Sequence, residues 1–219
     1  MKEGRPVIAV IGGTGAEGSG LAMRWAQAGY RVLVGSRSAE RAVEVAGEFG
    51  AEGMDNKTAA AACDIAVLTV PYGAQRATLS ELRDVLQGKI LVDVTVPLVP
   101  PKVMRVQLPE EGCAALVAQA VLGDGVRVVS AFQNVSAGHL SDPDHTIDCD
   151  VLITGDDPAA RAEVVQLATA AGLKGIEAGP LDNAVAAEAM TSLLIWINRK
   201  YKSPGAGLRI TALSANSED

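Results

Sequence analysis

The sequence predicts an α/β fold, in which a doubly wound parallel sheet is followed by a small C-terminal α/β domain. Short β-branched, apolar runs alternate with helical stretches through the first two-thirds of the 219 residues, and this alternation is typical of parallel strands joined by right-handed crossovers. The first run, residues 7–11, is wholly apolar, as expected of a central strand covered on both faces. The pattern changes after about residue 138. We therefore predict one domain over residues 1–138 and a smaller one over 139–219.

The elements of the larger domain follow from apolar periodicity and from glycine and proline stops. Gly29 is a typical stop after a helix, and Pro71 ends an apolar run. We predict strands at 7–11, 31–35, 64–70, 89–95 and 127–132, and helices at 19–28, 39–49, 58–63 and 74–86. In the smaller domain we predict strands at 150–155 and 175–178, and helices at 158–171 and 182–202. The final residues, SANSED, are expected to be disordered.

Composition excludes several classes of protein. With 48% apolar and 21% charged residues, the chain has enough core material to fold, and its net charge of −7 argues against a nucleic-acid partner. Three widely spaced cysteines, Cys63, Cys113 and Cys149, argue against a disulfide scaffold. With only two histidines, we expect no metal site.

Neither end of the chain carries a predicted membrane segment. The N-terminal apolar run has six residues, too few for a signal peptide. The apolar stretch 184–197 is interrupted by Glu188 and is shorter than the roughly 20 residues needed to cross a bilayer. We therefore expect a cytoplasmic protein with free thiols and no membrane partner.

A glycine-rich turn follows the first predicted strand directly and opens the first helix. It contains the pattern GxGxxG at Gly13, Gly15 and Gly18. One glycine of such a motif makes a tight turn, the next lets a pyrophosphate approach the backbone, and the third allows a helix to pack closely on a strand. Between an apolar strand and a helix, the motif predicts a Rossmann dinucleotide-binding unit, although a turn without a ligand is the alternative.

The end of the second predicted strand bears on the choice of nucleotide. An NAD site would place Asp or Glu there to bind the ribose 2′-hydroxyl. This chain instead has Ser36 and Arg37, with Arg41 four residues later. Because arginine binds phosphate oxygens bidentately, these residues favour NADP. The alternative is that both arginines are surface charges paired with Glu40 or Glu44.

Few side chains qualify as a general acid or base. Tyr72 follows a strand, but position 76 is arginine and so the Tyr-x-x-x-Lys spacing is absent. His139 and His145 fall in a predicted loop and are expected at the surface. Asp64 and Asp93 lie at strand edges and are expected to be structural. We therefore predict no catalytic side chain.

The ends of the later strands are uncharged. They comprise Thr69 to Tyr72, Thr95 to Leu98, and Gln133 to Ala137. Ligands of open parallel sheets bind at the carboxyl ends of the strands. An apolar, amide-bearing lining suits a flat heteroaromatic ring, and it suggests hydride transfer directly between two planar cofactors.

These motifs resemble the F420-dependent NADP reductases, which transfer hydride between NADP and the 5-deazaflavin coenzyme F420. The resemblance covers nearly the whole chain. The matching stretches are IGGTGAEGSGLAMRWAQAGYRVLVGSRS at 11–38, ACDIAVLTVPY at 62–72, KILVDVTVPL at 89–98, VVSAFQNVSA at 128–137, GDD at 155–157, AGPLDNA at 178–184 and INRKYK at 197–202.

The resemblance implies a set of cofactor-binding residues and a homodimer. The pyrophosphate would lie against Thr14, Gly15, Ala16 and Glu17, after Gly13 of the motif. The 2′-phosphate would be held by Ser36, Arg37 and Arg41, with Val70 and Ala137 along the NADP and Tyr72 at the same strand end. The deazaflavin would lie between the domains, against Val96, Pro97, Leu98, Gln133, Val135 and Gly207. Some members have histidine where this chain has Gln133, a difference that concerns the second substrate more than the nucleotide.

Two other functions stay open at this point. One is an NADPH-dependent reductase that uses an ordinary flavin, FMN or FAD, as in ferric reductase domains with a similar dinucleotide fold. The other is a non-catalytic NADP-binding sensor, regulated through a dimer. Activity with F420 would separate the leading prediction from both.

Overall fold

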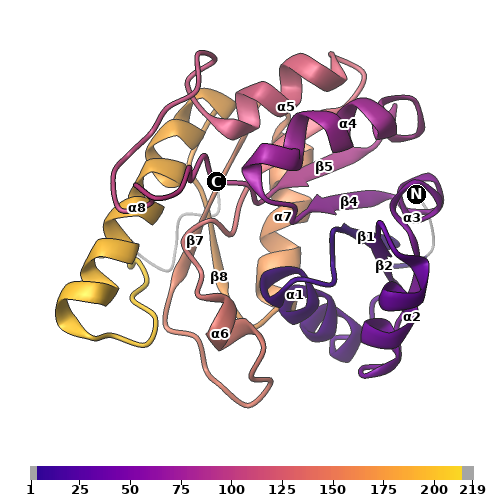
Figure 1. Ribbon diagram of the computed structural model, residues 1–219, viewed down its shortest axis with the longest axis horizontal. Helices are drawn as coiled ribbons and strands as arrows, with labels where there is room; N and C mark the ends of the chain where they lie inside the picture. Colours follow the sequence, from indigo (N-terminus) through magenta and orange to yellow (C-terminus); the bar gives the residue numbers. More distant parts are fainter. Residues whose placement is uncertain (1–3, 214–219) are drawn as a thin grey trace.

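The computed structural model describes residues 4–213 and has a single eight-stranded sheet in the order β3-β2-β1-β4-β5-β6-β7-β8 (Figure 1). Pairing is parallel throughout, except between β6 and β7, which run antiparallel. The strands are β1 (Ile8–Ile11), β2 (Val32–Ser36), β3 (Glu52–Asp55), β4 (Ile65–Leu68), β5 (Ile90–Asp93), β6 (Arg127–Ser130), β7 (Asp150–Gly155) and β8 (Lys174–Glu177). The predicted α/β class is confirmed.

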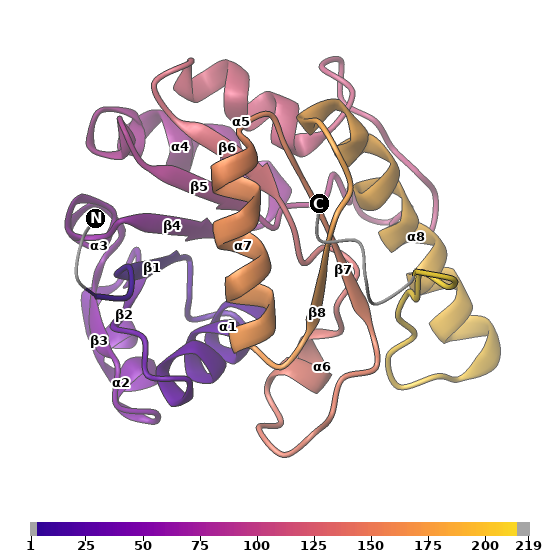
Figure 2. The same cartoon turned by 180° about the vertical axis from the view of Figure 1, so that it is seen from behind.

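Helices cover both faces of the sheet. They are α1 (Ala16–Gln27), α2 (Ala39–Gly47), α3 (Asn56–Ala62), α4 (Tyr72–Leu86), α5 (Ala114–Leu122), α6 (Ala137–Leu140), α7 (Pro158–Ala170) and α8 (Ala184–Tyr201), with a 3-10 turn at Leu181–Asn183. Figure 2 shows α7 lying across one face. Helices α1, α2 and α7 contribute to one apolar core, and α3, α4 and α5 to the other.

Successive side chains of β1 point alternately into the two apolar cores, one on each face of the sheet. In β1, Ile8 and Val10 pack with the first core, whereas Ala9 and Ile11 pack with the second, and all four are fully buried. The wholly apolar run is explained by this two-sided burial. In the first core the indole of Trp25 also donates a hydrogen bond to the carbonyl of Leu167 at 2.8 Å, which ties α1 to α7.

Every strand predicted from the sequence is present, with ends that differ by at most two residues. The first helix begins three residues earlier than predicted, at Ala16, so its first turn belongs to the glycine motif. Three elements were not predicted: β3, α5 and the short α6. Strands β7 and β8 continue the main sheet; the division into domains after residue 138 stays a prediction. The SANSED tail lies outside the described residues.

Two further features bear on the expectations about thiols and about a membrane segment. The three cysteines are free and buried. Within residues 4–213, no helix has the length and apolar character that a membrane span requires.

Candidate functional site

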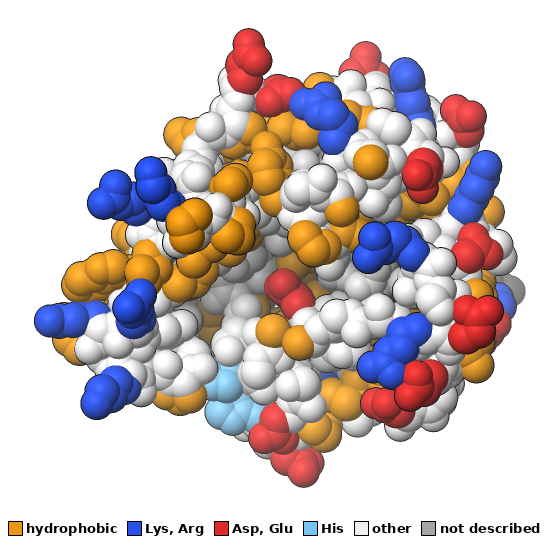
Figure 3. Space-filling model, viewed as in Figure 1, with side chains coloured by type: hydrophobic (Ala, Val, Ile, Leu, Met, Phe, Trp, Pro, Cys, Tyr) orange, Lys and Arg blue, Asp and Glu red, His pale blue; other side chains and the backbone are white. Residues whose placement is uncertain are grey.

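The carboxyl ends of six parallel strands meet at one edge of the sheet. Because the strand order is 3-2-1-4-5-6, the chain changes direction between β1 and β4, and the segments that follow these two strands diverge there. Such a switch point is where open α/β sheets bind ligands. Figure 3 shows a hollow at the centre of this view, between the part of the surface over α8 and the part over α1.

The glycine-rich turn is fixed to the strands on either side of β1. The Gly13 N–H donates to the carbonyl of Gly35 in β2 at 2.9 Å, and the Gly12 N–H donates to the side chain of Asn56 at 3.1 Å. On the other side, the Thr69 hydroxyl donates to the carbonyl of Ile11 at 3.0 Å. The turn is therefore held in one conformation before any ligand arrives.

The glycines of the turn differ in how much room a side chain would have at their positions. Gly12, one residue before the motif, has a φ of +75°, in the left-handed region that favours glycine. A Cβ on Gly18 would lie 2.5 Å from the Thr69 hydroxyl and 2.8 Å from the Cα of Gly13, so α1 packs directly on the sheet. A Cβ on Gly15 would meet nothing closer than the Gly12 carbonyl oxygen at 3.9 Å.

The open space over Gly15 coincides with a free helix end. Gly15 is the N-cap of α1 and supplies no side-chain hydrogen bond to the first-turn N–H groups. Uncapped N–H groups with the positive end of the helix dipole form an anion site. The residues present therefore fit a pyrophosphate in the manner that the motif predicts.

Glu17 lies in the first turn of this helix and is half-buried. Burial raises the pKa of its carboxyl group to about 8. The group is therefore neutral at pH 7, and it adds no negative charge beside the anion site. Sequence reasoning placed Glu17 near the pyrophosphate but gave no sign of its protonation state.

The tip of β2 presents one buried hydroxyl and two exposed guanidinium groups. Ser36 is 9% exposed, and its hydroxyl accepts a hydrogen bond from the Ser38 N–H at 3.3 Å. Arg37 is exposed. Arg41 forms an ion pair with Glu44 on α2 at 2.6 Å, a pairing that sequence reasoning held as the alternative to phosphate binding. An exposed pair of this kind contributes little stability, so it leaves Arg41 available to a stronger anion.

The tips of β4, β5 and β6 lie next to one another in the sheet order, which brings the uncharged segments predicted from the sequence to one edge. Half-buried side chains there are Val70, Tyr72, Val96, Leu98 and Ala137, whereas Pro97, Gln133 and Val135 are buried.

The amide of Gln133 is directed into the protein. Its Nε2 donates to the Asp93 carbonyl at 2.8 Å and to the Ser130 hydroxyl at 2.7 Å, while its Oε1 is buried without a hydrogen-bond partner. The Gln133 carbonyl accepts from the Thr191 hydroxyl of α8 at 2.9 Å. This residue therefore joins the tips of β5 and β6 to α8.

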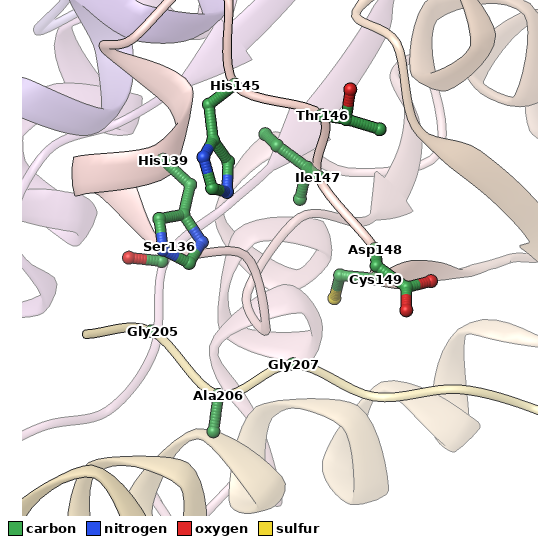
Figure 4. A pocket seen from close by; sticks show the side chains of 10 residues that line it. All are labelled: Ser136, His139, His145, Thr146, Ile147, Asp148, Cys149, Gly205, Ala206 and Gly207. Carbon is green, nitrogen blue, oxygen red and sulfur yellow. The ribbon is translucent and has the colours of Figure 1, made fainter. Parts of the chain in front are cut away.

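A small pocket of about 160 Å³ opens between α6, the segment that leads into β7 and the chain after α8 (Figure 4). Gly207, a predicted deazaflavin contact, lines it together with Ser136 and Cys149. The His139 and His145 rings stack there with centroids 4.2 Å apart. His145 is exposed, as predicted, and His139 is half-buried on α6.

One buried arginine, missed by sequence reasoning, joins α1 to this pocket. The Arg24 guanidinium donates to five carbonyl oxygens at 2.6–3.1 Å, those of His139, Leu140, Asp142, His145 and Ala171. Desolvation lowers the pKa of Arg24. The contacts span more than a hundred residues of sequence, so no local pattern could indicate them.

Comparisons with known proteins agree with this geometry. Residues 7–97 match a family model described as NADP oxidoreductase, coenzyme F420-dependent. The chain is 41% identical to the F420-dependent NADP reductase of Methanocaldococcus jannaschii, over 94% of this chain and 98% of that protein. Identity to the F420-dependent NADP reductase of Methanothermobacter thermautotrophicus is also 41%, over 94% of this chain and 95% of that protein. A crystal structure from Arthrobacter sp. FB24 shares the fold, with a TM-score of 0.84 and 24% identity, over 94% of this chain and all of that one.

Proposed function

The chain belongs to the family of F420-dependent NADP reductases, and on that basis we propose that it transfers hydride between NADP(H) and the 5-deazaflavin coenzyme F420. It is thus an oxidoreductase with two small-molecule substrates, each of which supplies the ring that gives or takes the hydride. The protein's part is to bind the two, align their rings and exclude water.

The observation that carries the proposal for NADP(H) is the pairing of a free helix end with a basic strand tip at the switch point. The open turn of Gly13, Thr14 and Gly15, with Ala16 and Glu17 on α1, suits the pyrophosphate. Ser36, Arg37 and Arg41 replace the acidic residue that would select NAD. We assign Val70, Tyr72 and Ala137 to the remainder of the nucleotide.

The second substrate is assigned to the neighbouring tips. Val96, Pro97 and Leu98 follow β5, and Gln133 and Val135 follow β6. We also assign Gly207 to this substrate; it lines a pocket with Ser136, which follows Val135 in the chain. Val96 and Leu98 are half-buried and apolar, so they offer a surface on which a flat ring can lie. We assign no general acid or base to the hydride step. The domains over 1–138 and 139–219 would flank this second-substrate site.

We propose a homodimer, and exposed apolar side chains of α8 and of the segment after β5 support it. They are Val99, Val106, Leu108, Leu193, Trp196 and Tyr201, at 45–70% exposure. Figure 3 shows apolar side chains over α8. Met104 and Trp196 line one shallow depression, which connects the two segments. A second copy, related by a two-fold axis, would cover this surface.

The buried free thiols suit a reducing compartment. We therefore assign the protein to the cytoplasm.

The deciding experiment mixes the protein with NADPH that carries deuterium at the transferable position and with oxidised F420. We expect NADPH absorbance and deazaflavin absorbance to fall together, with the deuterium recovered in the reduced deazaflavin. Turnover with FMN or FAD and none with F420 would replace this proposal by a flavin reductase. Tight NADPH binding without turnover of any acceptor would replace it by a sensor.

A further inference from the structure

Two carboxyl groups beneath the strand tips are buried, and the hydride step uses neither. Asp93, the last residue of β5, has no exposed surface, and Glu188 on α8 is 1% exposed. Asp93 accepts hydrogen bonds from Gln75 Nε2 at 2.5 Å and from the Thr95 N–H at 2.9 Å. No lysine, arginine or histidine among residues 4–213 forms an ion pair with either carboxylate.

Glu188 caps a helix that is distant in sequence. Its two carboxylate oxygens accept from the N–H groups of Ala114 at 2.6 Å and Ala115 at 3.0 Å, the first residues of α5. The side chain of the N-cap residue itself, Cys113, does not cap the N–H groups of α5; its thiol hydrogen-bonds to Glu188 instead. All donors to the two acids, the Cys113 thiol included, are therefore uncharged.

Gln75 joins the two acids into one cluster. Its Nε2 donates both to Asp93 and, at 2.8 Å, to the carbonyl of Ala114, the residue that also binds Glu188. The Oε1 of Gln75 is buried and has no hydrogen-bond partner. The cluster therefore contains a free acceptor of the kind that a protonated carboxyl group needs.

Two negative charges in this cluster would lack a compensating cation. Burial raises the pKa of Asp93 to about 6 and that of Glu188 to about 8, and the charge of Asp93 adds to the second effect. The other titratable groups that face Glu188 are the Cys113 thiol, whose pKa burial raises to about 12, and the Tyr72 phenol, whose pKa is also raised. Both are neutral at pH 7.

The cluster supports the surface assigned to the second substrate from beneath. The backbone runs from Asp93 directly into Val96, Pro97 and Leu98, and the Asp93 carbonyl binds the Gln133 amide. On α8, Thr191 lies one turn after Glu188 and binds the Gln133 carbonyl. A change in charge at Asp93 and Glu188 is therefore transmitted to the positions of the segments that follow β5 and β6.

We propose that Asp93 and Glu188 share one proton at neutral pH and that, as positioning residues, they set the shape of the second-substrate site through that proton. Loss of the proton leaves two repelling carboxylates, which separates α8 from the tip of β5 and weakens substrate binding. The functional half of this inference rests on the proposed function, whereas the presence of the proton does not.

Infrared spectroscopy tests for the proton without any substrate. A protonated carboxyl group has a C=O stretching band apart from the carboxylate bands. Because Glu17 is also neutral at pH 7, the experiment uses Glu17→Gln as its background. We expect a remaining band that disappears as pH rises through about 8. Selective ¹³C labelling of aspartate or of glutamate identifies its owner without substituting Asp93 or Glu188. Absence of the band at neutral pH would overturn the inference.

Kinetics test the positioning role. In the Glu17→Gln background, KM for F420 should rise by up to roughly tenfold as pH passes through about 8, with kcat and KM for NADPH nearly constant. Adding Glu188→Gln should remove this rise, whereas the exposed Asp182→Asn should leave it unchanged. A KM for F420 that is independent of pH in the Glu17→Gln protein would overturn the positioning role.

The two failures are distinguishable. Absence of any turnover with F420 refutes the proposed function and the positioning role, and the infrared band still decides whether the pair holds a proton. Turnover with F420 but no band refutes the inference alone.

Discussion

The guanidinium group of Arg41 lies 2.6 Å from the carboxylate of Glu44, one turn further along α2. Both side chains are more than half exposed, and hydrogen bonding to Glu44 raises the pKa of Arg41. An exposed pair of this type is worth at most about 1 kcal/mol, less than a charge-assisted bond to phosphate. Arg41 is therefore expected to leave Glu44 and bind the 2′-phosphate when NADP binds. Within residues 4–213, no ion pair of this kind has to break at Arg37.

Replacing Arg37 should separate the two nicotinamide nucleotides. Arg37→Ala is expected to weaken NADPH binding by about 1–3 kcal/mol and to leave NADH binding nearly unchanged, because only NADPH carries the 2′-phosphate. The matched variant Glu44→Gln frees Arg41 and should change NADPH affinity by no more than about 0.5 kcal/mol, in the direction of tighter binding. Calorimetric titration with both nucleotides provides the measurement. Equal losses for NADPH and NADH in Arg37→Ala would contradict the assignment.

Alanine substitutions at Gly15 and Gly18 should affect different properties, nucleotide binding at the first and stability at the second. A methyl group on Gly15 meets no atom closer than 3.9 Å, and the backbone there, with φ −80° and ψ 163°, suits alanine. Gly15→Ala should therefore keep or raise the free energy of unfolding by up to about 1 kcal/mol, yet weaken NADPH binding at least about tenfold by occupying the pyrophosphate position. Gly18→Ala should instead destabilise the fold by about 1–3 kcal/mol, because its methyl group collides with Thr69 and Gly13. Urea unfolding and NADPH titration of both variants check this pair; normal nucleotide binding by Gly15→Ala would remove the pyrophosphate from this turn.

Nucleotide affinity should depend on pH through Glu17. Its pKa is raised from 4.5 to about 8, so the carboxyl group is neutral below pH 8 and negative above it. NADPH binding should weaken as pH rises through about 8, when a charge appears beside the pyrophosphate, and Glu17→Gln should bind with no such dependence.

The same shift makes a prediction about stability. Between pH 4.5 and 8 the folded protein holds a proton on Glu17 that the unfolded chain releases, so this contribution to stability falls as pH rises across that window. Melting temperatures of the Glu17→Gln protein should fall less over the same range. Parallel pH profiles for the two proteins would show that Glu17 is ionised in the fold.

Arg24 should be among the most sensitive positions outside the apolar core. Arg24→Ala leaves five carbonyl groups without their donor, and we expect a loss of about 3 kcal/mol or more in unfolding free energy. Arg24→Lys should recover only part, because an ammonium group cannot reproduce the planar fork. The exposed Arg31, paired with Glu52, is the control, and its replacement by alanine should cost at most about 1 kcal/mol. Similar losses at both positions would contradict the role given to Arg24.

The proposed dimer depends on Trp196. Trp196→Arg places a charge in the centre of the exposed apolar surface of α8 and should weaken association by about 2 kcal/mol or more. Val43→Arg, on an equally exposed apolar residue of α2, should leave association unchanged. Sedimentation velocity over a range of protein concentrations measures both. A wild-type protein that sediments as a monomer throughout would refute the dimer.

Local pattern was sufficient for most of the sheet but failed at elements that distant residues complete. The strands from β1 to β6 that are buried on both faces were predicted because two-sided burial leaves continuous apolar runs. Strand β3, EGMD, lies at the sheet edge and is partly exposed, so its sequence carries no such run. Helix α5 has no polar stripe and no side-chain N-cap of its own, so its sequence does not mark it as a helix. Its cap is Glu188, which lies 74 residues away in sequence.

The candidate site divides in the same way. The glycine motif and the arginines after β2 are contiguous in sequence, so their grouping could be predicted. The Asp93–Glu188 cluster and the Arg24 contacts join segments that only the folded chain brings together, and Asp93 was accordingly expected to be merely structural. The residue-level assignments to NADP and F420 stay predictions.

The antiparallel junction between β6 and β7 limits how this chain can be recombined with its relatives. Only two residue pairs, Val129 with Gly155 and Ser130 with Thr154, form this junction. A Cβ on Gly155 would lie 3.0 Å from the Val128 carbonyl oxygen. A side chain at position 155 would therefore press on the backbone of β6. A chimaera that joins the N-terminal part of one family member to the C-terminal part of another is expected to pair best with glycine at this position. The boundary of such a chimaera is therefore better placed outside the segment that contains both β6 and β7 than between these two strands.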